Sequence, residues 1–235
     1  MEKRISVAPM MGQTDRHFRY MISLMAKDVK LYTPMIHAEA IVHSEKNFIK
    51  KENSNQKEVG IQIAGNDPDI VARAACIIEQ HNYNEINLNI GCPSERVQNC
   101  SVGVALMKQP ELVADIVGHL SKVTSLPVSI KSRIGVDDYD NYEFLYDFID
   151  QTSSAGCDHF IIHARKAILK GLNPKENRTI PPLDYERVRR IKNDFNSLRV
   201  EVNGEIDSIE KIEAKLKIFD GVMIGRESYK NPFFL

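Results

Sequence analysis

Polar side chains that could do chemistry follow several short apolar runs of the sequence. Cys92 lies in the segment 89–94, where Gly91 and Pro93 predict a bent loop that displays the thiol among polar neighbours. A cysteine thiol is mostly protonated at neutral pH, so Cys92 could act as a general acid. The other cysteines are expected to be small buried residues: Cys76, inside a helical pattern, Cys100 and Cys157.

Lys131 ends another apolar run and is expected to be buried. Such a lysine needs an electron-rich partner, so it could form a Schiff base, as in an aldolase, or donate to a carbonyl of a cofactor. Gln62 and Asn89 carry amides, which can both donate to and accept from the edge of a heterocycle. The sequence shows no paired carboxylates, no HExxH or CxxC motif and no Ser-His-Asp arrangement. Hydrolysis, a metal site and a disulfide framework therefore lack candidate residues.

Eight short apolar or β-branched runs would position these side chains. They are Ile5–Pro9, Leu31–Ile36, Val59–Ala64, Glu85–Ile90, Val128–Lys131, Phe160–His163, Val200–Asn203 and Gly221–Ile224. Helical patterns separate most of them: one from Pro110, one capped by Asp67, and one capped by Thr14 or Asp15 with the apolar residues Phe18, Met21, Ile22 and Met25. This alternation predicts an α/β protein with a (β/α)8 TIM barrel. A Rossmann fold would need GxGxxG after the first strand, and the chain has APMMGQ there.

In a barrel, the last two strands commonly end in a phosphate site. Here they end in Asn203-Gly204 and Gly225-Arg226. Each glycine could simply make a turn, but together they favour backbone that approaches a phosphate closely.

Composition and charge limit the classes of protein. Hydrophobic residues make up 43% and charged residues 27%, as in ordinary globular proteins, and no apolar run approaches a membrane span. The net charge is -1, yet nine lysines and arginines against three acids between Phe160 and Lys192 give a local charge of +6. Such a stretch is usually a solvated face, but it could also bind a polyanion. Without a signal peptide or a disulfide pattern, we expect a cytoplasmic protein with no membrane partner and no metal.

The ordered motifs resemble those of the tRNA-dihydrouridine synthases over essentially the whole chain. They are Ser6 to Met10 followed by Thr14-Asp15, Gln62 to Gly65, Ile86 to Pro93, Lys131 to Arg133, Ile162 to Arg165, Asn203-Gly204 and Gly225-Arg226. The segments 92–98 and 174–178 resemble the bacterial A-type subfamily, which modifies uridines 20 and 20a of the tRNA D-loop.

The resemblance implies a flavoenzyme in which NADPH reduces FMN, the flavin passes hydride to carbon 6 of uracil, and Cys92 protonates carbon 5. It implies contacts of FMN with Pro9, Met10, Met11, Gln62, Lys131 and His163, and of its phosphate with Asn203, Gly204, Glu205, Gly225 and Arg226. Asn89 would help to place the uracil, and Arg165, Lys175 and Arg178 would contact tRNA. The target uridine would be flipped out of the folded RNA.

Two features differ from the family pattern. Glu205 occupies a position that is often glycine in this subfamily, so its carboxylate should point away from the phosphate. Asn231-Pro232 looks like the start of a helix just before Leu235. We therefore expect residues 1–235 to be the FMN-binding TIM-barrel catalytic domain, without the closing helix and without the family's C-terminal helical tRNA-binding domain. Phe233, Phe234 and Leu235 are too few to cover an apolar flank.

Two alternatives stay open on the sequence. One is an FMN barrel that oxidises or reduces a small molecule, like the dihydroorotate dehydrogenases, although this does not explain the basic segment 174–178. The other is a truncated, non-catalytic fragment that only binds flavin or RNA.

Overall fold

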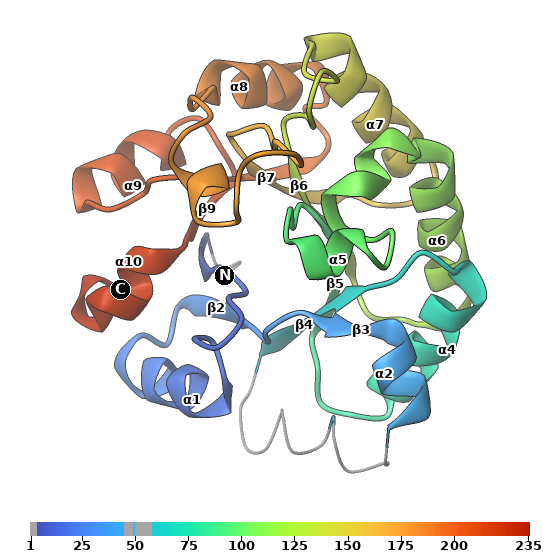
Figure 1. Ribbon diagram of the computed structural model, residues 1–235. Coiled ribbons are helices and arrows are strands. Elements are labelled where there is room, and N and C mark those ends of the chain that lie inside the picture. The colour runs from blue at the N-terminus through green and yellow to red at the C-terminus, as the bar shows by residue number, and fades with distance from the viewer. Residues whose placement is uncertain (1–3, 45–48, 50–57) are drawn as a thin grey trace.

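The computed structural model describes residues 4–44, 49 and 58–235. Over these residues, parallel strand segments form one sheet in the order β2-β1-β9-β8-β7-β6-β5-β4-β3, and β2 also pairs with β4. This extra pairing closes the sheet into a barrel ringed by helices, as Figure 1 shows. The strands are β1 (Ile5–Val7), β2 (Val29–Tyr32), β3 (Ile36–His37), β4 (Val59–Ala64), β5 (Glu85–Ile90), β6 (Val128–Arg133), β7 (His159–His163), β8 (Arg199–Asn203) and β9 (Gly221–Ile224).

The second predicted strand is split in two. β2 and β3 both pair with β4 and together take one of the eight strand positions, so the predicted (β/α)8 barrel is confirmed. Pro34 lies between them, and a proline has no N–H to donate to a strand ladder. The chain therefore leaves the sheet after Tyr32, although Thr33 N still donates to Gly60 O at 3.0 Å.

Helices connect the strands on the outside of the barrel. They are α1 (Arg16–Met25), α2 (Ala38–His43), α4 (Pro68–Glu79), α5 (Glu95–Gln98), α6 (Pro110–Val123), α7 (Tyr142–Ser154), α8 (Tyr185–Asp194), α9 (Ile209–Leu216) and α10 (Arg226–Lys230), with 3₁₀ turns η1 (Gly103–Lys108), η2 (Glu176–Arg178) and η3 (Pro232–Phe234). Asp15 and Asp67 cap α1 and α4 as predicted, each accepting two backbone N–H groups. No helix within the described ranges is long and apolar enough to cross a bilayer.

The predicted apolar face of the first helix is only partly correct. Phe18 and Ile22 are buried against Val7, Val29 and Leu31, but Met21 and Met25 are exposed. The helix packs against the barrel along one narrow stripe, so residues one position away from that stripe face solvent.

The last strand is followed by two short elements. α10 was not predicted, and the predicted helix start at Asn231-Pro232 is the single turn η3. Phe233 is 90% exposed, but Phe234 and Leu235 pack against the core. Two of the three residues expected to be too few to cover the flank therefore contact the core.

A polar cluster fills the barrel near the amino ends of the strands. Glu85 and Glu201 are almost fully buried, and His159 lies between them, 3.0 Å from Glu201 Oε1 through Nε2 and 3.7 Å from Glu85 Oε2 through Nδ1. Despite its burial, His159 has its pKa raised to about 9 by these two carboxylates. The pKa of Glu85 is lowered to about 2, although burial opposes this, because His159 and Lys30 stabilise its charge. We call Glu85, His159 and Glu201 the amino-end cluster.

Candidate active site

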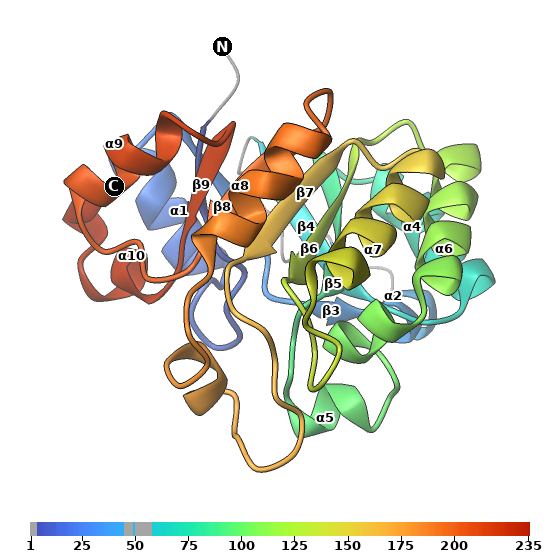
Figure 2. The same cartoon turned by 90° about the horizontal axis from the view of Figure 1, so that it is seen from above.

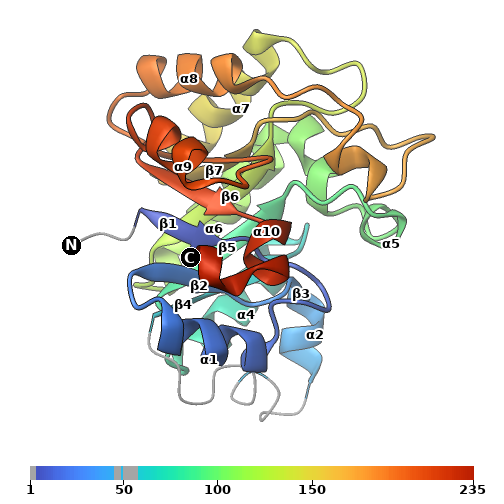
Figure 3. The same cartoon turned by 90° about the vertical axis from the view of Figure 1, so that its left-hand side faces the viewer.

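The predicted polar residues meet at the carboxyl ends of the strands. Asn89 lies opposite Lys131 in the ladder of β5 and β6, and His163 lies opposite Asn203 in that of β7 and β8. Figure 2 shows α5 and the loop after β7 projecting from this same end, and Figure 3 shows it from the side. The barrel therefore brings together side chains that are more than 100 residues apart in the sequence, such as Asn89 and Asn203.

The Asn89 amide fixes the loop that carries Cys92. Asn89 Oδ1 accepts from Cys92 N at 3.0 Å and from Gly91 N at 3.3 Å, while its Nδ2 donates to Gln62 Oε1 at 2.9 Å. Gln62 is buried and donates in turn to Asn87 Oδ1 at 2.7 Å. The amides of Gln62 and Asn89, which were predicted to face a heterocycle, are thus hydrogen-bonded to each other and position the cysteine loop.

Arg133 is a structural residue of this site, which the sequence analysis included in a motif without assigning it a role. It is 3% exposed, its Nε donates to Gly91 O at 3.0 Å, and its Nη1 donates to Asn177 O at 2.9 Å. It therefore ties the Cys92 loop to the loop after β7. Arg133 lies two residues after Lys131, so the sequence places both side chains on the same face of β6.

Cys92 is partly exposed, and its Sγ donates to Ser94 Oγ at 3.4 Å. Of the other cysteines, Cys157 is buried as expected, but Cys76 and Cys100 are exposed, which corrects their predicted burial. Cys76 lies on α4 outside its buried stripe, and Cys100 lies in the turn after α5.

The charges of Lys131, which is partly buried, and Arg133, which is buried, act on the thiol. Burial, followed by the charge of Arg133, lowers the pKa of Lys131 to about 7, and Cys92 opposes this shift. Burial also lowers the pKa of His163 well below its usual value, helped by Arg133 and Lys131, so its imidazole is neutral at physiological pH. A neutral imidazole and a lysine near its pKa can both exchange hydrogen bonds with an uncharged heterocycle.

The turn after β9 leaves room for a ligand, whereas the glycine in the turn after β8 is packed closely against other side chains. Gly204 has φ +131°, and a Cβ there would lie 2.8 Å from Leu183 Cδ2 and 3.1 Å from His163 Cδ2. A Cβ on Gly225 would meet nothing within 4 Å, so the backbone there is open. Arg226 follows at the start of α10.

Glu205 takes the left-handed conformation, with φ +46°, which suits the glycine expected at this position. Its carboxylate forms an ion pair with Arg165 Nη2. Arg165 is 4% exposed and also donates to Pro181 O. Its predicted place on the exposed tRNA-binding surface is therefore corrected: it is a buried residue that neutralises Glu205.

The basic stretch divides into two parts. Lys170, Lys175 and Arg178 are exposed on the loop after β7, at the site end of the barrel. The remaining six cations each have a partner within the protein. Directly after β7, Arg165 pairs with Glu205 and Lys166 pairs with Asp140. On α8, the partners are Asp184 for Arg187, Glu186 for Arg189, the Tyr142 ring for Arg190 and Asp220 for Lys192. Only the first part can act at the site.

The loop after β1 supplies the remaining predicted contacts. Pro9 and Met10 are half-buried at the barrel mouth, and Met10 N donates to Thr14 Oγ1 at 2.9 Å. Met11 is 65% exposed. Over the described ranges, no three histidine, cysteine or acidic side chains gather as a metal ion would require.

Comparison with known proteins identifies the family of this chain. A model of the dihydrouridine synthase family matches residues 6–235. The chain belongs to this family. It is 47% identical over 235 residues to the tRNA-dihydrouridine(20/20a) synthase of Shewanella oneidensis, covering 100% of this chain and 70% of that protein. It is 50% identical over 233 residues to the enzyme of that name from Shigella flexneri, covering 99% and 68%.

A solved structure shares the fold. A 2-naphthoyl-CoA reductase complex superposes with a TM-score of 0.71 at 10% identity, covering 98% of this chain and 49% of that one. This likeness concerns the barrel architecture alone.

Proposed function

We propose that this chain reduces uridine to 5,6-dihydrouridine in tRNA, at positions 20 and 20a of the D-loop, with FMN as cofactor and NADPH as reductant. The observation that carries the proposal is the thiol of Cys92 at the mouth of the barrel, on a loop that Asn89 and Arg133 hold in place. Membership of the family and the names of the relatives support the same substrate.

The residues present fit FMN. The open backbone at Gly225 offers room for a phosphate, with Arg226 next in the chain and Gly204 in the neighbouring turn. Asn203 and Glu205 complete this turn, and the pairing of Glu205 with Arg165 offsets the one negative charge near the phosphate. Lys131, His163 and Gln62 would hold the ring and ribityl groups, with Pro9, Met10 and Met11 beneath the ring.

FMN, when bound and reduced by NADPH, would supply the hydride that is added to carbon 6 of uracil. Cys92 then donates the Sγ proton to carbon 5, and the thiolate that remains lies beside Lys131 and Arg133, whose charges stabilise it. Asn89 keeps the cysteine loop in place during this transfer, and it also contributes to holding the uracil. Lys175 and Arg178 bind the phosphates of the RNA.

The exposed cations distinguish this function from reduction of a small molecule. Lys170, Lys175 and Arg178 are exposed on the loop after β7, at the site end of the barrel, whereas a small substrate needs no such surface. We further propose that residues 1–235 act as the FMN-binding catalytic domain, in the cytoplasm, without a metal ion.

The test is turnover with defined substrates. Purified protein loaded with FMN is incubated with NADPH and unmodified tRNA, free uracil or orotate, and both NADPH oxidation and dihydrouridine are measured. We expect dihydrouridine in tRNA only. Turnover of orotate in its place would establish the small-molecule alternative, and flavin binding without turnover of any substrate would establish the non-catalytic one.

A further inference from the structure

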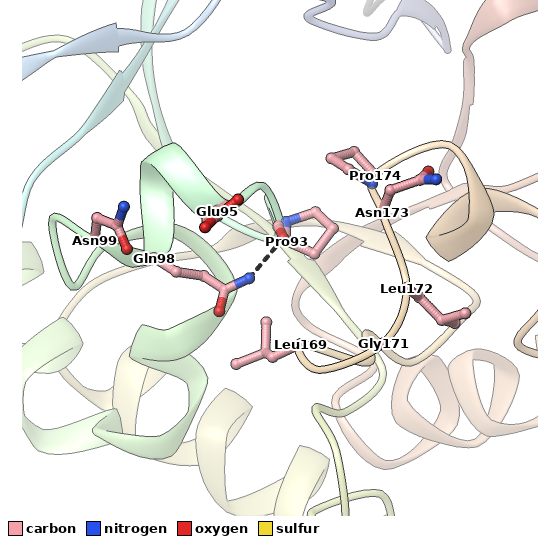
Figure 4. Close-up of a pocket in the computed structure, with 9 residues that line it drawn as sticks. All are labelled: Pro93, Glu95, Gln98, Asn99, Leu169, Gly171, Leu172, Asn173 and Pro174. Atoms are coloured by element: carbon pink, nitrogen blue, oxygen red, sulfur yellow. Dashed lines mark hydrogen bonds between the residues drawn. The ribbon is translucent and has the colours of Figure 1, made fainter.

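A pocket of about 490 Å³ lies beside the cysteine loop, between α5 and the loop after β7 (Figure 4). Pro93, which directly follows Cys92, forms one wall, and Leu172 and Pro174 form part of another. None of these residues has a role in the site described above. Because the pocket shares a wall with the loop that carries the acid, its occupant would lie next to the uracil being reduced.

The lining suits a flat heterocycle. Pro93, Leu172 and Pro174 present apolar surface on which an aromatic ring can pack, and Glu95, Gln98 and Asn173 present polar groups. Unstacked RNA bases are bound in this way, with an apolar surface against the ring and hydrogen bonds along its edge.

The internal hydrogen bonds of the pocket determine which polar atoms remain for a ligand. Gln98 Nε2 donates to Pro93 O at 2.8 Å, which leaves Gln98 Oε1 as an acceptor. Asn173 Oδ1 accepts from Lys175 N at 2.8 Å and Glu176 N at 3.0 Å, which leaves Asn173 Nδ2 as a donor. Glu95 adds a carboxylate, which only accepts. Asn99, also on the α5 side, carries an amide that both donates and accepts. The α5 side of the pocket therefore offers more acceptors than donors, and the opposite side offers a donor.

The charges favour a base over a phosphate inside the pocket. Glu95 is the charged member of the lining, and it would repel a phosphate. Lys170 and Lys175, which border the segment 171–174, are exposed at the rim. A nucleotide would accordingly place its base in the pocket and its phosphate against these lysines.

We propose that this pocket binds a nucleobase with an exocyclic amino group, from a nucleotide next to the target uridine. The inference rests on the proposed function, because it requires an RNA substrate. The amino group donates to Glu95 and Gln98, and a ring acceptor takes the Asn173 Nδ2 hydrogen. Uracil has no exocyclic amino group, so adenine, guanine and cytosine are preferred over it.

RNA stem-loops with one target uridine test this proposal. The nucleotides on the two sides of the target are changed in turn to adenine, guanine, cytosine or uracil, and KM and kcat for dihydrouridine formation are measured. For the preferred base, Glu95→Gln should raise KM about tenfold, as expected from the loss of a base-edge contact, with kcat and NADPH oxidation unchanged. For uracil at the same position, the substitution should change KM little.

A matched control is Glu143→Gln, since Glu143 is an exposed acid in the first turn of α7, away from the pocket. Leu172→Trp is a second variant, which fills the pocket and should raise KM for every flanking base. Affinity for the same stem-loops is measured by fluorescence anisotropy, so the pocket is tested even if no dihydrouridine forms. If Glu95→Gln and Leu172→Trp both bind all stem-loops as the unmodified protein does, the pocket does not hold a base. If the protein binds these RNAs with the predicted base preference but never forms dihydrouridine, only the proposed function fails.

Discussion

Lys131 Nζ donates to Asn203 Oδ1 at 3.2 Å, across the mouth of the barrel. Asn203 in turn donates through Nδ2 to Met223 O at 2.7 Å. These two bonds connect β6 to β8 and β9, and they link the residue proposed for the flavin ring to the turns proposed for its phosphate. Occupation of either part of the site is therefore expected to affect the other.

Lys131 should make FMN binding depend on pH. Its pKa is lowered to about 7 by burial and by Arg133, so the free protein loses this proton as the pH rises through 7. An anionic or electron-rich ligand such as FMN stabilises the protonated lysine. The phosphate of FMN has already lost its second proton near pH 6. FMN affinity should thus be highest below pH 7 and fall up to tenfold per pH unit above it, as fluorescence titration can measure. Lys131→Ala should weaken binding and flatten this dependence, and Lys131→Arg should flatten it while keeping the charge.

Gly225→Val should weaken FMN retention. A Cβ on Gly225 points into open space, which is where we place the phosphate, so a branched side chain there would occupy the room of the ligand. The absorbance ratio of flavin to protein after gel filtration measures retention. Gly118→Val is the control, because a Cβ at that position on α6 also meets nothing within 4 Å. Equal flavin content in the two variants would contradict the phosphate placement.

Cys92→Ala should separate the two half-reactions. The thiol acts on uracil and not on the flavin, so reduction of bound FMN by NADPH should stay intact. Dihydrouridine formation should fall about 10²- to 10⁴-fold, the usual contribution of a general acid. Cys100→Ala, an exposed cysteine in the turn after α5, should leave both rates unchanged. A parallel loss of flavin reduction in Cys92→Ala would rule out the assigned role.

The amino-end cluster should make stability depend on pH in two directions. The pKa of His159 is raised to about 9, so its contribution is complete below pH 6.5 and is lost as the pH rises through 9. The pKa of Glu85 is lowered to about 2, so its contribution is complete above pH 4.5 and is lost as the pH falls through 2. Both contributions are present between pH 4.5 and 6.5.

His159→Gln tests the alkaline limb of this dependence. At pH 6 the substitution should lower the free energy of unfolding by about 3 kcal/mol, because it removes the cation that two buried carboxylates share, although Glu85 still pairs with Lys30 and Glu201 with Arg199. The difference from the unmodified protein should shrink as the pH rises from 7 to 10. Urea unfolding at several pH values measures it, and a constant difference over this range would show that His159 is not charged in the folded protein.

Lys175→Ala should weaken tRNA binding and its salt dependence. Lys175 is exposed on the loop after β7, and one lost phosphate contact should lower the slope of log affinity against log salt concentration by about 1. Lys122→Ala, an exposed lysine in the last turn of α6 at the other end of the barrel, should leave the slope unchanged. Filter binding at several salt concentrations gives both values.

The sequence alone determined the barrel and the strand ends that carry the site. Short apolar runs and caps such as Asp67 act over a few residues, so they can be recognised without knowing the fold. The position of Cys92, Lys131 and His163 after such runs was enough to predict that they meet, because parallel strands of a barrel end at one rim.

Only the tertiary structure decided what these residues contact. Three sets of contacts join segments that are 40 or more residues apart. They are the pairing of Arg165 with Glu205, the hydrogen bond from Arg133 to the cysteine loop, and the cluster of Glu85, His159 and Glu201. Local propensity carries no information on such pairs. A buried charge is stable only beside a specific partner, and which partner is near depends on how the closed sheet brings its strands together.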